Sequence, residues 1–205
     1  PVHARNWNEL WEKSYEPVVV GDFCAIRATF HQPINHVQHE IVIDPKMSFG
    51  TGHHETTCMM VKQMSHLEFN KKVVLDYGCG TAILAILAAK LGAGEVDAID
   101  IDHWAFENAV ENCKRNGVEF IDVAETDIGH APHKKYDFIL ANIHTQVLVS
   151  RMPAIAHHLH PGGQVLLSGF YENELEEMKD AAKSSGLAFK NYDTKNNWCC
   201  ALFEQ

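Results

Sequence analysis

The sequence predicts an α/β fold: a doubly wound, Rossmann-like sheet of seven strands, mostly parallel with an antiparallel last strand, plus a small N-terminal strand and helix appendage. From residue 72 onward, apolar runs with strand character alternate with helical segments, which is typical of a parallel sheet covered by helices. A glycine-rich turn follows the first run, where such sheets bind ligands. The last two runs have no helix between them, so the final strand should insert antiparallel.

The strands and helices of the main domain follow from this rhythm. Residues 73–76 form an apolar run with glycines behind it, as expected of a strand buried on both faces. Gly92 and Gly117 stand where glycine commonly ends a helix. The expected strands cover residues 73–76, 96–100, 120–124, 136–141, 164–169, 187–192 and 198–203, and the expected helices cover 82–91, 103–116, 145–160 and 172–185.

The N-terminal part is expected to be a connecting segment and a small appendage. Trp7, Leu10 and Trp11 have helical spacing, and Pro17 should end that helix, so residues 1–20 are interpreted as a linker. Residues 23–30 and 40–43 are predicted as short strands at the start of a domain that covers 21–205. A glycine-rich loop at 49–52 should lead into a helix over 53–67.

Composition limits the kinds of function that are plausible. The chain has 205 residues, enough for one full α/β domain, and no apolar run long enough to span a membrane. A formal net charge of −10 argues against nucleic acid as the main ligand, whereas it permits a basic protein substrate. The first 20 residues contain no apolar run typical of a secretory signal, so none is expected, and because the chain begins at Pro1 we expect further sequence upstream.

Cysteine and histidine usage indicates a cytoplasmic protein without a metal site. The six cysteines include no C-x-x-C pair, so free thiols in a reducing cytosol are expected. None of the 14 histidines falls in an H-E-x-x-H motif, and no histidine pair accompanies a cysteine pair at zinc spacing. His157, His158 and His160 are placed at the end of a helix, where they suit the negative end of the helix dipole.

The turn after the first strand carries the chemistry. Gly78 allows a tight turn and Gly80 allows a ligand to approach the backbone, although this pair alone would also suit an ordinary strand-to-helix turn. Position 83 is Ile, so the third glycine of the dinucleotide fingerprint is missing and a pyrophosphate seat is disfavoured. Asp76, two residues before Gly78, would repel a pyrophosphate but suits an ammonium group.

A carboxylate at the end of the second strand completes the ligand prediction. Asp100 ends that strand 22 residues after Gly78, where a carboxylate can accept hydrogen bonds from both ribose hydroxyls. Asp102 is the alternative ribose partner, but it follows by two residues and should point elsewhere. These features fit S-adenosylmethionine, which contains an adenosine and an amino acid end and has no phosphate.

These residues resemble a known family. The segment 76–81, Asp-Tyr-Gly-Cys-Gly-Thr, together with Asp-Ile-Asp at 100–102, resembles the class I S-adenosylmethionine-dependent methyltransferases. The element Phe-Gly-Thr-Gly-x-His-x-Thr-Thr at 49–57 and the Ala-Asn-Ile of 141–143 narrow the resemblance to the PrmA-type ribosomal protein methyltransferases. Members of that family methylate amino groups of the stalk-base protein of the large ribosomal subunit. The resemblance runs from about Asn6 to the C-terminus.

The resemblance implies roles for individual residues. Thr57, Gly78 and Asp100 would contact the cofactor. Asn142 would orient the target nitrogen and also contact the cofactor. Thr57 would equally suit an ordinary first helical turn, and Asn142 an ordinary turn. Asp127 would face the adenine or be an exposed loop acid.

Two more residues are assigned to the substrate side of the site. Phe49 would cover the active site or pack in the core. His54 could help remove a proton from the substrate amine, because its unperturbed pKa is near neutrality.

The chain departs from the family pattern at two positions. Glu55 replaces a usual Pro, which affects substrate preference, and Ala82 replaces a usual Gly, which should leave cofactor binding intact because Ala is small and favours helix. The family also implies an N-terminal docking domain for the ribosomal protein, and residues 6–17 resemble the linker to it.

Three functions follow as hypotheses. The leading one is a protein N-methyltransferase that uses S-adenosylmethionine on a large-subunit ribosomal protein. The second is a methyltransferase for another protein or a small molecule. The third is a nucleotide- or NAD-binding protein, against which the missing third glycine argues. The oligomeric state is not indicated by the sequence.

Overall fold

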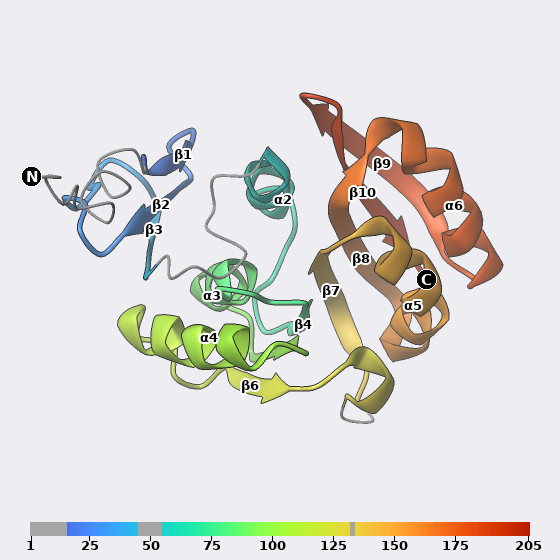
Figure 1. Cartoon of the computed structure of the whole chain (residues 1–205), viewed down its shortest axis with the longest axis horizontal. Coiled ribbons are helices and arrows are strands. Elements are labelled where there is room, and N and C mark those ends of the chain that lie inside the picture. Colours follow the sequence, from blue (N-terminus) through green and yellow to red (C-terminus); the bar gives the residue numbers. More distant parts are fainter. Residues whose placement is uncertain (1–15, 45–54, 132–133) are drawn as a thin grey trace, which may run out of the picture.

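The computed structural model describes residues 16–44, 55–131 and 134–205, which fold around two sheets (Figure 1). The expected helix around Trp7 and Trp11 and the glycine-rich loop at 49–52 lie outside these ranges.

The larger sheet has seven strands in the order β6-β5-β4-β7-β8-β10-β9. The pairs β4–β5, β4–β7, β5–β6 and β7–β8 are parallel, whereas β10 runs antiparallel to both β8 and β9. The predicted fold class is therefore confirmed, including its antiparallel last strand. The strands are β4 (Val73–Tyr77), β5 (Glu95–Asp100), β6 (Asp122–Glu125), β7 (Tyr136–Asn142), β8 (Leu159–Tyr171), β9 (Ala188–Lys195) and β10 (Trp198–Glu204).

Helices cover both faces of this sheet, as Figure 1 shows. Alternate residues of β4 belong to two separate apolar clusters, Val74 to one and Leu75 to the other, so the strand is buried on both faces. The first cluster includes residues of α2 (Glu55–Met64), α3 (Ile83–Lys90) and α4 (His103–Arg115). The second includes residues of α5 (Thr145–His158), α6 (Leu175–Ser184) and the 3₁₀ helix η1 (Ile128–His130); a second 3₁₀ helix, η2 (Glu172–Glu174), precedes α6.

The smaller sheet consists of β1 (Val18–Val20), β2 (Cys24–Ala28) and β3 (His39–Ile43). β1 pairs antiparallel with β2, which pairs in parallel with β3. Its buried residues Ile26 and Ile41 join the same apolar cluster as α3, so this sheet packs onto the main domain. The sequence had placed Val18–Val20 in the linker, but this segment pairs with β2.

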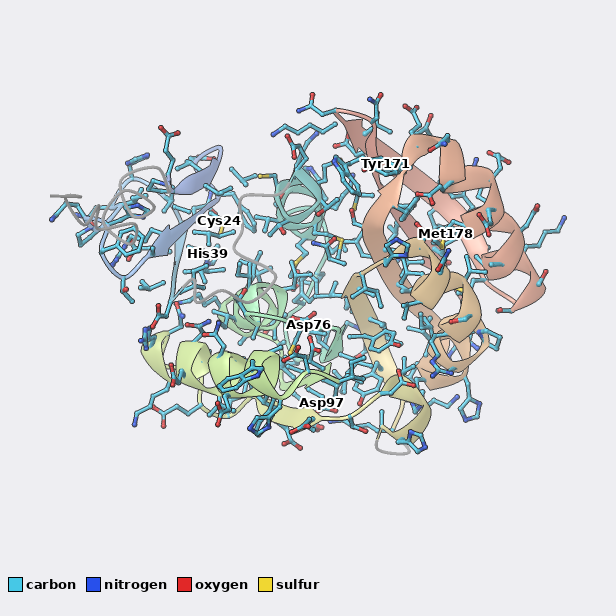
Figure 2. All side chains as sticks on the ribbon, in the orientation of Figure 1. Cys24, His39, Asp76, Asp97, Tyr171 and Met178 are labelled. Atoms are coloured by element: carbon cyan, nitrogen blue, oxygen red, sulfur yellow. The ribbon has the colours of Figure 1, made fainter. Side chains whose placement is uncertain are left out.

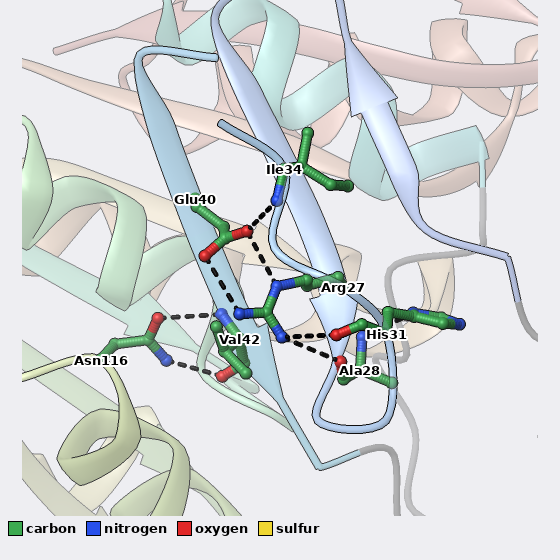
Figure 3. Close-up of polar contacts among 7 residues, drawn as sticks. All are labelled: Arg27, Ala28, His31, Ile34, Glu40, Val42 and Asn116. Atoms are coloured by element: carbon green, nitrogen blue, oxygen red, sulfur yellow. Dashed lines mark hydrogen bonds and ion pairs between the residues drawn. The ribbon is translucent and has the colours of Figure 1, made fainter. Parts of the chain in front are cut away.

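An ion pair fastens β2 to β3 in this sheet. The Nε of Arg27 lies 2.8 Å from Oε1 of Glu40, and the same carboxylate accepts the backbone N–H of Ile34 at 2.6 Å (Figure 3). The bond from Arg27 is the main cause that lowers the pKa of Glu40. Parallel strands need a long connection, and this carboxylate holds the connection from 29 to 38 against the sheet.

Several predicted boundaries differ from the structure. α5 ends at His158, so His160 lies in β8 and not in a helix, because β8 begins at Leu159. The predicted strand over 120–124 shifts to Asp122–Glu125. β9 extends to Lys195, beyond the predicted end at 192, so only Asn196 and Asn197 connect it to β10, and both have positive φ, as a type I′ hairpin turn requires. Among the described residues, no helix is both long and apolar enough to cross a membrane.

Candidate active site

The order of the strands reverses between β4 and β7. β5 and β6 lie on one side of β4, and β7 begins the other side. In such sheets the crevice at the carboxyl ends of the strands binds the ligand. The predicted site residues Asp76, Gly78, Asp100 and Asn142 come from the ends of β4, β5 and β7, so the topology brings them to one edge.

The glycine loop, residues 78–82, follows β4, and every second residue in it has a left-handed backbone conformation. Gly78, Gly80 and Ala82 have φ values of +70°, +54° and +62°. The backbone N–H groups of Gly78 and Cys79 both donate to the carbonyl of Ile99 in β5, at 2.8 and 3.0 Å. The loop therefore follows β4 in the chain and is hydrogen-bonded to the neighbouring strand β5.

Asp76 holds the start of α3, the helix that follows the glycine loop. Its side chain is buried in the interior (Figure 2). Its Oδ2 accepts the backbone N–H of Ala85 in the first turn of α3 at 2.9 Å. Burial raises the pKa of Asp76 to about 7, the Ala85 bond opposes that rise, and the charge of Asp100 adds to it. The carboxylate thus stabilises the start of α3, and direct contact with an ammonium group stays a prediction.

Asp100 bonds the glycine loop itself. Its Oδ2 accepts the backbone N–H of Gly80 at 2.9 Å, and Oδ1 accepts that of Asp102 at 3.0 Å. Asp102 instead caps α4, where its Oδ1 accepts the N–H groups of Trp104 and Ala105 at 2.7 and 3.2 Å. Of the two carboxylates, only that of Asp100 is bonded to the glycine loop in the described part of the chain.

Asn142 and Thr57 meet at the end of β7. The Nδ2 of Asn142 donates to Oγ1 of Thr57 at 3.2 Å, although the two residues are 85 positions apart in the sequence. Thr57 is buried in the first turn of α2. This bond fixes the plane of the Asn142 amide at the edge where the glycine loop begins.

The next residue, Ile143, is confined by two glycines. A Cβ at Gly78 would overlap Cγ2 of Ile143. A Cβ at Gly169, which has φ +92°, would overlap the Ile143 carbonyl oxygen and lie 2.8 Å from its carbonyl carbon. The N–H of Ile143 also donates to the carbonyl of Ser168 at 3.1 Å. Packing against Ile143 therefore requires glycine at position 78, whether or not a ligand is bound.

Comparison with known proteins identifies the family of the chain. A family model described as Ribosomal protein L11 methyltransferase (PrmA) matches residues 1–205. The Ribosomal protein L11 methyltransferase of Phocaeicola vulgatus is 42% identical over 201 residues, which cover 97% of this chain and 72% of the relative. A protein of the same name from Porphyromonas gingivalis is 42% identical over 200 residues, covering 97% and 69%. The chain belongs to the PrmA family.

A solved PrmA-type structure supports the same assignment. The ribosomal protein L11 methylase of Lactobacillus delbrueckii subsp. bulgaricus matches this fold with a TM-score of 0.83 and 29% identity, over 92% of this chain and 97% of that chain. The resemblance to the PrmA type inferred from the motifs at 49–57, 76–81 and 141–143 is confirmed.

Ala82 differs from its expected conformation. The PrmA-type pattern has Gly at this position, and the sequence suggested that Ala would simply start the helix. The helix begins at Ile83, and Ala82 precedes it with φ +62° and ψ 24°. Glycine suits this position because a Cβ is disfavoured in the left-handed region.

Glu55, the second departure from the PrmA-type pattern, begins α2. Its Oε1 accepts the Nδ2 of Asn196 at 2.9 Å, which connects the β9–β10 hairpin to the helix that carries Thr57. A proline at this position could not form that bond.

Asp127 is neither exposed nor unpaired. One carboxylate oxygen accepts the hydroxyl of Tyr77 at 2.8 Å, and the other lies 2.9 Å from the guanidinium of Arg151. Burial, and then the bond to Asp127, raise the pKa of Tyr77. The interpretation of Asp127 as an exposed loop acid is therefore wrong, whereas its contact with adenine stays a prediction.

Some residues of the site were not found from the sequence, and others lie outside the described ranges. The missed residues are Gly169 and Asn112, of which the second bonds the carbonyl of Thr81 in the glycine loop at 3.2 Å. Phe49 and His54 lie outside the described residues. Within the described ranges, no group of three or more His, Cys, Asp or Glu side chains could hold a metal ion.

Proposed function

We propose that this chain transfers methyl groups from S-adenosylmethionine to amino groups of ribosomal protein L11, in the cytoplasm where ribosomal proteins are made. One observation carries the proposal: in a PrmA-family chain, the glycine loop, Asp100 and the Thr57–Asn142 pair converge at one edge of the sheet. Family membership favours this function over a nucleotide- or NAD-binding protein.

The residues at this edge suit S-adenosylmethionine. A carboxylate has about four acceptor positions, so Asp100 can accept ribose hydroxyls beside its two backbone bonds. The loop 78–82 carries no cationic side chain, and Asp76 and Asp100 flank it, which suits a ligand without phosphate. When bound, the cofactor supplies a methyl group already activated on a sulfonium. We assign Gly78 and Gly80 to its backbone contacts and Asp127 to its adenine.

The chain's own residues must hold a neutral amine in line with that methyl group. Asn142 is suited to this because Thr57 fixes its amide, leaving the carbonyl oxygen to accept an N–H of the substrate. An α-amine, with a pKa of roughly 7.7–8.0, is partly neutral near pH 7, whereas a lysine at roughly 10.4 is mostly protonated. We assign to Phe49 the exclusion of water and to His54 the acceptance of a proton from the amine.

The proposal is tested by binding and by transfer. Calorimetry with S-adenosylhomocysteine should show one site per chain, and mass spectrometry should show methyl groups added to ribosomal protein L11. Asn142→Ala should lower kcat/KM by roughly 10²-fold, the scale of a misplaced reactant. Asn191→Ala, on the exposed strand β9, is the matched control and should leave kcat/KM unchanged.

The two assays separate the remaining functions. Absence of S-adenosylhomocysteine binding would overturn the cofactor assignment. Binding without methylation of ribosomal protein L11, but with methylation of a small amine, would favour the alternative substrate class. Glu55 is the observation behind that alternative, because it departs from the PrmA-type pattern at the start of the helix that carries Thr57.

A further inference from the structure

Three asparagines form a row along α4: Asn108 and Asn112 lie in the helix, and Asn116 is its C-cap. Asn108, Asn112 and Asn116 are spaced by four residues, so they lie above one another on the helix. Asn108 and Asn112 are 1% and 0% exposed, and Asn116 is half-buried. Asn is a poor helix former, and burying an amide is costly unless it is hydrogen-bonded. The positions of these side chains therefore point to the bonds that they make.

The row binds the end of β3. Asn116 accepts the N–H of Val42 at 2.9 Å and donates to its carbonyl at 2.7 Å, as a neighbouring strand would (Figure 3). Asn112 accepts the N–H of Asp44 through Oδ1 at 2.9 Å, and Asn108 donates to the carbonyl of Asp44 at 3.4 Å. The helix thus holds the last residues of the small sheet through backbone groups.

Among the bonds within the described part of the chain, it is the amide of Asn112 that reaches the glycine loop. Its Nδ2 donates to the carbonyl of Thr81 at 3.2 Å and to Oδ1 of Asn108 at 3.1 Å. Thr81 follows Gly80, whose N–H is held by Asp100, so the loop is bonded on two sides. One fully buried amide therefore joins the glycine loop to the end of β3.

We propose that Asn112 is a positioning residue for the cofactor: its amide sets the conformation of the glycine loop relative to β3, and thereby the affinity of the site. The identity of the ligand rests on the function proposed above. Before Ala82 the loop contains Gly78 and Gly80 at positive φ, and glycine has many other conformations open to it, so the loop depends on its bonds to keep this shape. Fixing the Thr81 carbonyl reduces the entropy that cofactor binding would otherwise lose.

The matched pair Asn112→Ala and Asn116→Ala separates positioning from structural support. Each substitution removes bonds between α4 and the end of β3, so both variants should unfold at a lower temperature than the wild type. Only Asn112→Ala also releases Thr81. Calorimetry with S-adenosylhomocysteine, on fully folded protein, should show Kd raised about tenfold for Asn112→Ala and less than about twofold for Asn116→Ala.

A second variant keeps the test independent of folding yield. Asn112→Asp retains an acceptor for the N–H of Asp44 but can donate to Thr81 only when protonated. Its affinity for S-adenosylhomocysteine, relative to wild type, should therefore rise as the pH is lowered.

Each remaining outcome has a distinct meaning. Wild-type affinity in a folded Asn112→Ala variant would overturn the positioning role, and so would failure of both Asn112 variants to fold at any pH. A wild-type protein that does not bind S-adenosylhomocysteine would overturn the proposed function instead.

Discussion

The glycine loop after β4 and the short turn after β7, residues 142–144, touch each other but are held in different ways. The loop keeps its shape through hydrogen bonds to Asp100, Asn112 and the carbonyl of Ile99. The turn keeps its shape mainly because Ile143 fits between Gly78 and Gly169, where no Cβ has room. The loop is held chiefly by polar partners and the turn chiefly by steric fit, although Ile143 and Asn142 also donate hydrogen bonds to Ser168 and Thr57.

This difference indicates how each segment should tolerate change. A hydrogen-bonded loop can lose one partner and keep its other bonds, so we expect graded losses of affinity or stability. A turn confined by backbone atoms cannot accept an added methyl group without moving a strand, so we expect a large loss of stability.

The largest effect is expected for Gly169→Ala. The new Cβ would overlap the backbone of Ile143, and φ is +92°. Left-handed strain and overpacking together should lower the free energy of unfolding by roughly 3–5 kcal/mol, measured by denaturant titration. Gly186→Ala is the control, because its φ is +84° but nothing lies within 4 Å of the added Cβ. It should cost about 1–2 kcal/mol, and equal losses would show that Ile143 is not confined.

The next effect concerns Asp76 and pH. The folded protein raises its pKa to about 7 through burial, so between about pH 4 and pH 7 the folded state binds a proton that the unfolded state has released. The contribution of the protonated Asp76 carboxyl to the free energy of unfolding therefore falls as the pH rises, and it is lost above pH 7.

Asp76→Asn keeps an acceptor for Ala85 but does not titrate. Its stability relative to wild type should thus increase by about 2–3 kcal/mol between pH 5 and pH 8. Denaturant titrations of both proteins at the two pH values measure this change. A constant difference would show that Asp76 is ionised at both.

Asp100→Ala tests the polar side of the comparison directly. It removes the bond to Gly80 and the proposed ribose contact, so binding of S-adenosylhomocysteine should weaken by about 1.5–3 kcal/mol in calorimetry. Asp102→Ala should lower stability through the lost cap of α4 but change binding much less. The reverse order of affinities would mean that Asp102 holds the ribose.

Sequence patterns predicted the parts of this site that depend on strand order. Asp100 and Gly78 could be placed because Asp100 ends an apolar strand, Gly78 follows one, and the carboxyl ends of parallel strands meet at one edge. Asn142 was reached through the family resemblance. The parts that depend on exact approach were missed: Gly169 matters only because Ile143 folds against it, and Asn112 only because α4 lies against both β3 and Thr81. The four-residue spacing of Asn108, Asn112 and Asn116 was a signal that could have been used.

The smallest effect is expected for Ala82→Gly, where the polar loop meets the start of α3. Glycine would relieve roughly 1–2 kcal/mol of left-handed strain at φ +62°. It would also lose a buried methyl group, about 0.8 kcal/mol, and add about 0.4–1 kcal/mol of unfolded-state entropy. These terms nearly cancel, so the free energy of unfolding should change by less than about 1 kcal/mol.

Ala85→Gly is the matched control, because Ala85 is equally buried but lies within the helix. It should lose about 2 kcal/mol, from the methyl group and helix propensity together. Equal losses in the two denaturant titrations would mean that Ala82 carries no strain, and that the loop owes its shape to its hydrogen bonds alone.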